Sequence, residues 1–204
     1  MASTMTDSTM VNPVTKIERS FDWIVEDIGK DLHINGVEYT RDVYAYLQRK
    51  LLVFNGAHAI LGWLGYNRGI ESPALAMQDE QIREIVEGAL KEAANAISVE
   101  YKINSDKMEN YIQTISDRFQ NKFIPDKTER LAKDPLRKLS ERVIAATLLA
   151  QKNGLPTNYL RQGIEAGLEY NNPSDKESVE LQTLLKQKNS DGVMKEYFGL
   201  CLKE

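Results

Sequence analysis

The sequence has a single cysteine, Cys201, among 204 residues and no long uninterrupted apolar run. One cysteine can form neither an internal disulfide nor a cysteine metal cluster, so we expect a reducing, cytoplasmic environment. A membrane span needs about 18 consecutive apolar residues, so none is expected. The net charge of −4 argues against a non-specific nucleic-acid binder, which would be basic. A hydrophobic content of 42% predicts an ordinary soluble globular core.

The sequence also lacks the short motifs of several common catalytic sites. It contains no G-x-G-x-x-G after a predicted strand and no P-loop. It also contains no H-E-x-x-H and no G-x-S-x-G. These absences predict that the chain holds no nucleotide fingerprint and no metal site of its own.

Helical periodicity dominates the sequence, which predicts a mainly α fold of about seven or eight helices. Residues 1–14 are rich in Ser, Thr and Met and predict a disordered tail, and residues 15–204 predict one helical domain. The segment 16–29 is ambiguous, because its apolar residues fit a helix or a strand. The predicted helices cover residues 49–65, 73–101, 106–119, 127–137, 141–153, 158–170, 175–188 and 192–202.

The segment 49–65 is apolar but contains Lys50, Asn55 and His58. At about 100° per residue these three fall within an arc of about 140° on one helix. In the simplest interpretation Lys50 reaches outward to water, and the other two satisfy backbone groups. In a functional interpretation, a desolvated lysine acts as a general base beside two groups that bind oxygen.

A basic segment follows at 127–138, with Arg130, Lys133, Arg137 and Lys138. Such a charge pattern is typical of a solvated helix face. It also suits an anion clamp, because the arginine fork matches phosphate geometry. His33 lies in a polar segment and is given no role.

The pattern Lys50-x4-Asn55-x2-His58, within RKLLVFNGAHAILGWLGY, resembles the mannitol dehydrogenase family of polyol-specific long-chain dehydrogenases. The resemblance continues through NKFIPDKTERLAKDPLRKLSERVI and covers residues 17 to about 170. It implies the helical C-terminal substrate domain, similar to that of 6-phosphogluconate dehydrogenase-like enzymes, and it favours a strand in FDWIVED.

The resemblance also implies roles for individual residues. Lys50 matches the catalytic base, and Asn55 and His58 match the groups that hold the reacting oxygen. Arg130 and Lys138 match substrate contacts further along. The segment DPLRKLS, with Arg137, favours the mannitol-1-phosphate 5-dehydrogenase branch and a phosphate near these cations.

Two features depart from the family. No NAD-binding half is expected in this sequence, and Gly56-Ala57 stands where the family often has Thr-Gly. Two hypotheses follow. The chain is either the substrate and base half of an NAD-dependent polyol phosphate dehydrogenase, or a non-catalytic helical domain that binds a sugar phosphate or a protein. We expect a separate nucleotide-binding subunit, or self-association through the exposed domain interface.

Overall fold

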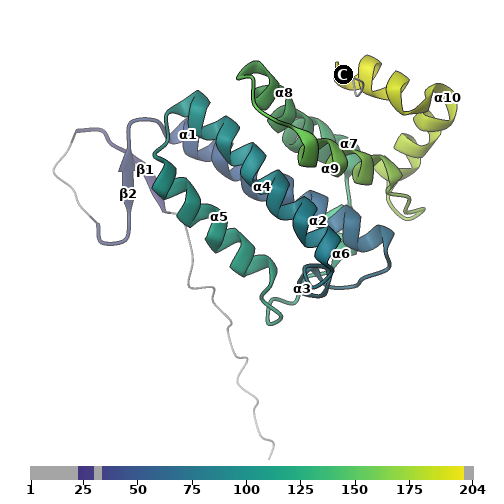
Figure 1. The fold of residues 1–204 in the computed structure, drawn as a ribbon, viewed down its shortest axis with the longest axis horizontal. Coiled ribbons are helices and arrows are strands. Elements are labelled where there is room, and N and C mark those ends of the chain that lie inside the picture. The colour runs from purple at the N-terminus through teal and green to yellow at the C-terminus, as the bar shows by residue number, and fades with distance from the viewer. Residues whose placement is uncertain (1–22, 30–33, 200–204) are drawn as a thin grey trace, which may run out of the picture.

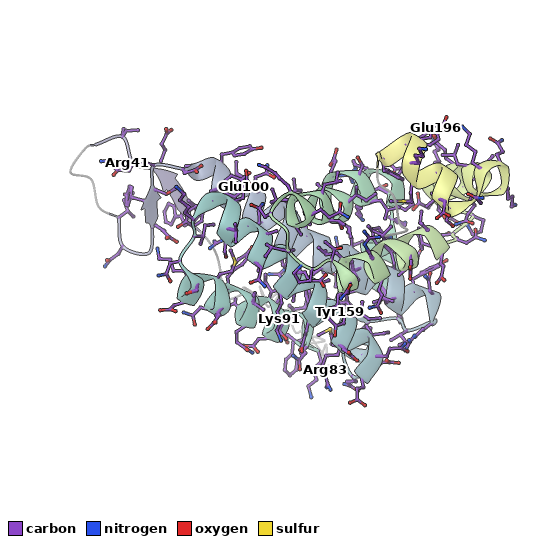
Figure 2. All side chains as sticks on the ribbon, turned by 45° about the horizontal axis from the view of Figure 1, so that its top comes forward. Arg41, Arg83, Lys91, Glu100, Tyr159 and Glu196 are labelled. Carbon is purple, nitrogen blue, oxygen red and sulfur yellow. The ribbon has the colours of Figure 1, made fainter. Side chains whose placement is uncertain are left out.

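The computed structural model describes residues 23–29 and 34–199, so the predicted tail at 1–14 lies outside the described residues. The fold is mainly helical, as predicted, with one small parallel sheet at one end and the last helix at the other (Figure 1). Side chains of Arg41 and Glu196 mark these two ends in Figure 2. None of the described helices is long and apolar enough to cross a membrane. The elements are β1 (Ile24–Glu26), β2 (Glu38–Thr40), α1 (Val43–Gln48), η1 (Arg49–Phe54), α2 (Asn55–Asn67), α3 (Pro73–Ala76), α4 (Glu80–Tyr101), α5 (Ser105–Phe119), α6 (Thr128–Ala132), α7 (Pro135–Lys138), η2 (Leu139–Ile144), α8 (Ala145–Lys152), α9 (Asn158–Glu169) and α10 (Lys176–Phe198).

The ambiguous N-terminal segment is a strand where it is described. β1 pairs in parallel with β2, and Val25 is opposite Tyr39 in the register. The strand at 38–40 was not predicted from the sequence. A two-stranded sheet is marginally stable alone, so this pair depends on neighbouring structure.

Two helices contain a π-helical stretch. Residues 43–67 form one continuous helix through α1, η1 and α2, and residues 135–152 form another through α7, η2 and α8. The π-helix is rare, occurring in well under 1% of residues, and it is often found at functional sites. The two π stretches contact each other across the fold.

Helix α2 is the centre of the core, and α4, α6 and α9 pack around it. Trp63 is fully buried, and its Nε1 donates to the carbonyl of Ala132, 2.9 Å away. A Cβ on Gly62 would lie 2.6 Å from the Cβ of Leu131, so only glycine lets α6 approach α2 this closely. Gly65, predicted to end the helix, instead makes room for Thr128, while Gly69 adopts φ +69° after the helix.

Several predicted helix boundaries are wrong. The helix predicted at 73–101 is two helices, because Asp79 begins α4 by accepting a hydrogen bond from the backbone of Ile82 at 3.1 Å. The helix predicted at 127–137 is also divided. Asp134 adopts φ +57°, and Pro135 then starts α7 instead of ending α6. The last two predicted helices form α10, which has a kink at Asn189, where φ is +56°.

Candidate functional site

The Lys50, Asn55 and His58 set lies on the first π turn and the start of α2. The backbone N–H of Asn55 donates to the carbonyl of Lys50, five residues earlier. A hydrogen bond with this spacing places residues i and i+5 one turn apart. Lys50 and Asn55 are therefore closer to the same side of the helix than they would be in a regular α-helix. His58 follows about one turn later.

Lys50 is exposed, as in the interpretation in which it reaches outward to water, and is not desolvated within this chain. It lines an open groove of about 1030 Å³ between η1 and α5. The groove wall also includes Phe54, Lys107, Tyr111 and Arg118, which combine apolar surface with positive charge. The amine is therefore accessible from the groove in this chain, and its desolvation depends on what fills the groove.

His58 lies between two phenylalanine rings. Its ring centroid is 5.3 Å from that of Phe54 and 5.1 Å from that of Phe119, with nearly parallel planes. Only 18% of its side chain is exposed. Burial lowers the pKa of His58 to about 4, and the nearby cations add to the effect, while Asp126 opposes it. The imidazole is therefore neutral near pH 7 and can accept or donate one hydrogen bond.

Asp126 connects His58 with the basic segment. Its carboxylate accepts a hydrogen bond from Nε of Arg130 at 2.6 Å and a second, shorter one from Nη2. Burial alone would raise the pKa of Asp126, but Arg130 outweighs burial, so the pKa is lowered. Asp126 lies 3.7 Å from Nε2 of His58, which is too long for a hydrogen bond. The nitrogen of His58 thus stays available to another partner.

Lys138 is buried, with 7% of its surface exposed, and its Nζ donates to the carbonyl of Leu131 at 3.0 Å. Desolvation and the neighbouring Arg142 lower the pKa of Lys138 to about 8. Arg142 is half-buried, and its Nη1 donates to the carbonyl of Asn55 at 3.4 Å. The charges of both cations also lower the pKa of His58.

Arg137 differs from these cations. It is exposed, and its guanidinium pairs with Asp134 at 3.0 Å and reaches Glu141 at 4.0 Å. Its backbone N–H donates to Glu177, which ties α7 to α10. Its predicted role in substrate binding stays a prediction.

The predicted site residues do not all line one cavity. Lys50 lines the groove, whereas His58 and Asp126 line a small adjoining cavity of about 20 Å³. Arg118 lines both, so it marks their common border.

Sequence reasoning missed Arg142 and Asp126. Arg142 is four residues after Lys138 on one helix, a spacing that places both on the same face. Asp126 was overlooked because it directly precedes the basic segment 127–138, and the cations drew the interpretation. No sequence feature indicated the two π turns, because their apolar residues fit a regular α-helix equally well. The described residues contain no group of His, Cys, Asp and Glu that could hold a metal ion.

Residues 42–197 match the mannitol dehydrogenase C-terminal domain. The chain belongs to this family. A mannitol dehydrogenase C-terminal domain is consistent with the mainly helical fold. Among solved structures, the fold is similar to Pseudomonas fluorescens mannitol 2-dehydrogenase in a ternary complex with NAD and D-mannitol, with a TM-score of 0.64 and 24% identity over 80% of this chain and 36% of that one. It is also similar to substrate-free D-sorbitol dehydrogenase, with a TM-score of 0.62 and 24% identity over 72% of this chain and 31% of that one.

Relatives of this mannitol dehydrogenase C-terminal domain include two mannitol-1-phosphate 5-dehydrogenases. The protein from Bacillus pumilus is 37% identical over 90% of this chain and 50% of its own length. The protein from Caldanaerobacter subterraneus is 35% identical over 84% of this chain and 45% of its own length. The chain thus spans about half the length of the curated relatives that it matches.

Proposed function

We propose that this chain forms the substrate-binding and catalytic-base half of an NAD-dependent dehydrogenase that interconverts mannitol 1-phosphate and fructose 6-phosphate. The observation that carries the proposal is the placement of Lys50, Asn55 and His58 on one helix beside an open groove and a group of cations. The similarity to mannitol-1-phosphate 5-dehydrogenases supports the choice of substrate.

In the proposed reaction, neutral Lys50 takes the proton of a secondary hydroxyl group as that carbon loses its hydride. The amide of Asn55 and the neutral imidazole of His58 hold the same oxygen and orient it toward the amine. When bound, NAD accepts the hydride from the carbon. In the reverse direction, protonated Lys50 returns the proton to the carbonyl oxygen of the ketose.

The described residues do not offer a turn rich in glycine between a strand and a helix, which is the usual cradle for a dinucleotide. In this proposal NAD is therefore held by a nucleotide-binding domain outside these residues, either in a longer chain or in a separate subunit. Closure of such a domain over the groove would desolvate Lys50 and favour its neutral form.

Exposed apolar side chains at the sheet end of the groove support docking of that domain. Leu47 lines the groove and is 58% exposed, and Tyr44 on the same helix is 60% exposed. Trp23 and Ile28, which flank β1, are 49% and 69% exposed. Exposed apolar side chains that form a continuous patch are typical of a surface that binds another protein domain.

The test uses this chain together with its nucleotide-binding domain, joined or separate. Nicotinamide absorbance is followed with NAD and mannitol 1-phosphate, and in reverse with NADH and fructose 6-phosphate. We expect turnover that Lys50→Met abolishes, while Arg83→Gln, on the exposed face of α4 (Figure 2), leaves it unchanged. Binding of the sugar phosphate without turnover would support a non-catalytic domain instead.

A further inference from the structure

Lys138, which is buried, and Arg142, which is half-buried, are neighbouring cations that we call the cation pair. Within the part of the chain that the structure describes, neither side chain forms an ion pair with a carboxylate. Lys138 donates one hydrogen bond to the described residues, to the carbonyl of Leu131, which uses one of its three N–H groups. Nε of Arg142 is buried and has no hydrogen-bond partner among the described residues.

Such an arrangement is costly for folding. Removing a cation from water costs several kcal/mol unless an anion or enough hydrogen bonds compensate. Two cations that repel each other add to this cost, and the carboxylates near them are engaged elsewhere. Asp134 and Glu141 lie against Arg137, and Asp175 accepts hydrogen bonds from the backbone of Asp134 and Glu177. The compensating negative charge is therefore expected from a ligand.

We propose that the cation pair is the subsite that binds the phosphate group of a phosphorylated polyol. Arginine can bind two phosphate oxygens at once through its planar fork, and the buried Nε of Arg142 supplies a donor without a partner. Lys138 adds a second positive charge with N–H groups to spare. This assignment rests on the proposed function for the identity of the polyol, but the anion site itself can be measured without turnover.

The position of Arg142 also connects the two ends of such a substrate. Its Nη1 contacts the carbonyl of Asn55, and Asn55 is the residue that closes the π turn over Lys50. A phosphate at the cation pair would therefore place the polyol chain beside Asn55 and His58. Without the phosphate, two buried cations would remain unpaired, so the subsite would select against the free polyol.

Arg142 thereby takes the phosphate contact for which DPLRKLS suggested Arg137. The guanidinium of Arg137 is 46% exposed and already bound to Asp134. A surface pair of this kind contributes little to binding, because water and salt screen it.

The test is calorimetric titration of the 204-residue chain with mannitol 1-phosphate, inorganic phosphate and mannitol. We expect Arg142→Gln to weaken binding of both phosphate compounds at least about tenfold, which is the size of one hydrogen bond to a charged group. Arg142→Lys retains the charge but loses the fork, so an intermediate loss is expected. Arg83→Gln removes one exposed positive charge on α4 and should change the affinity less than about twofold.

Circular dichroism checks that each variant is folded, and Arg142→Lys provides the answer if Arg142→Gln does not fold. Unchanged phosphate binding in the folded Arg142 variants would overturn the proposal, as would equal losses for mannitol and mannitol 1-phosphate. Failure of the wild-type chain to bind either phosphate compound would overturn it too. Phosphate binding that needs Arg142, in a chain that shows no turnover with its nucleotide-binding domain, would retain this subsite and reject the proposed dehydrogenase.

Discussion

The burial of His58 predicts that acid destabilises this domain well before its carboxylates are protonated. The pKa of His58 is lowered from 6.5 to about 4, chiefly because burial between Phe54 and Phe119 disfavours the imidazolium ion. The unfolded chain therefore binds more protons than the folded chain between these two values. The free energy of unfolding must then fall as the pH falls from about 6.5 to about 4.

The size of the effect follows from the two pKa values. They lie about 2.5 pH units apart, and each unit corresponds to about 1.4 kcal/mol. The predicted loss is about 2 kcal/mol at pH 5 and about 3 kcal/mol at pH 4. This is a large share of the free energy of unfolding of a typical domain, which is roughly 5–15 kcal/mol.

Urea unfolding, followed by tryptophan fluorescence at several pH values, measures this loss. His58→Phe retains an aromatic ring in the stack but cannot titrate, so its unfolding free energy should stay nearly constant over the same range. The chain has two histidines, and His33→Gln identifies which NMR signal belongs to His58. An NMR pKa near 6.5, or an equal loss of stability in wild type and His58→Phe, would refute the reasoning.

Three further predictions concern other groups. Lys50→Met should lower turnover with the nucleotide-binding domain by at least about 10²-fold, the lower range for a general base, while the affinity for mannitol 1-phosphate measured by calorimetry changes little. Affinity for mannitol 1-phosphate should fall as the pH rises above about 8, because Lys138 loses its proton there. Calorimetry from pH 7 to pH 9 should show this loss of affinity in the wild type but not in Lys138→Met. Glu92 accepts hydrogen bonds from the backbone of Tyr159 at 3.2 Å and of Leu160 at 2.8 Å. Glu92→Ala should therefore lower the free energy of unfolding, measured by urea titration, by about 2–3 kcal/mol. A loss below about 0.5 kcal/mol would contradict that role.

Local spacing in the sequence was enough to predict the mainly helical fold. Apolar periodicity identifies helices because each must bury one face. It does not identify where a helix is interrupted by its own side chains. Asp79 begins a new helix inside the segment 73–101, because capping the backbone of Ile82 competes with continuing the previous turn.

The parts of the site that escaped prediction depend on contacts between distant segments. Arg142 belongs to the site because η2 packs against η1 and brings its guanidinium to Asn55, 87 residues away in the sequence. The sequence left open whether Lys50 is desolvated or reaches outward to water, and the structure leaves it exposed in the groove. Spacing within one helix cannot report either fact, because both depend on which other element covers that face.

The π turn between Lys50 and Asn55 means that this helix carries one more residue than a regular α-helix needs for the same rise. Shortening the segment 51–54 by a single residue would let the helix become regular, at little cost to its hydrogen bonding. Lys50 would then precede Asn55 by four residues, which is one α-helical turn, so the two would stay on the same side of the helix. A one-residue deletion here should therefore leave a folded domain in which the amine keeps its place beside Asn55, whereas the same deletion in a regular α-helix would turn it by about 100°.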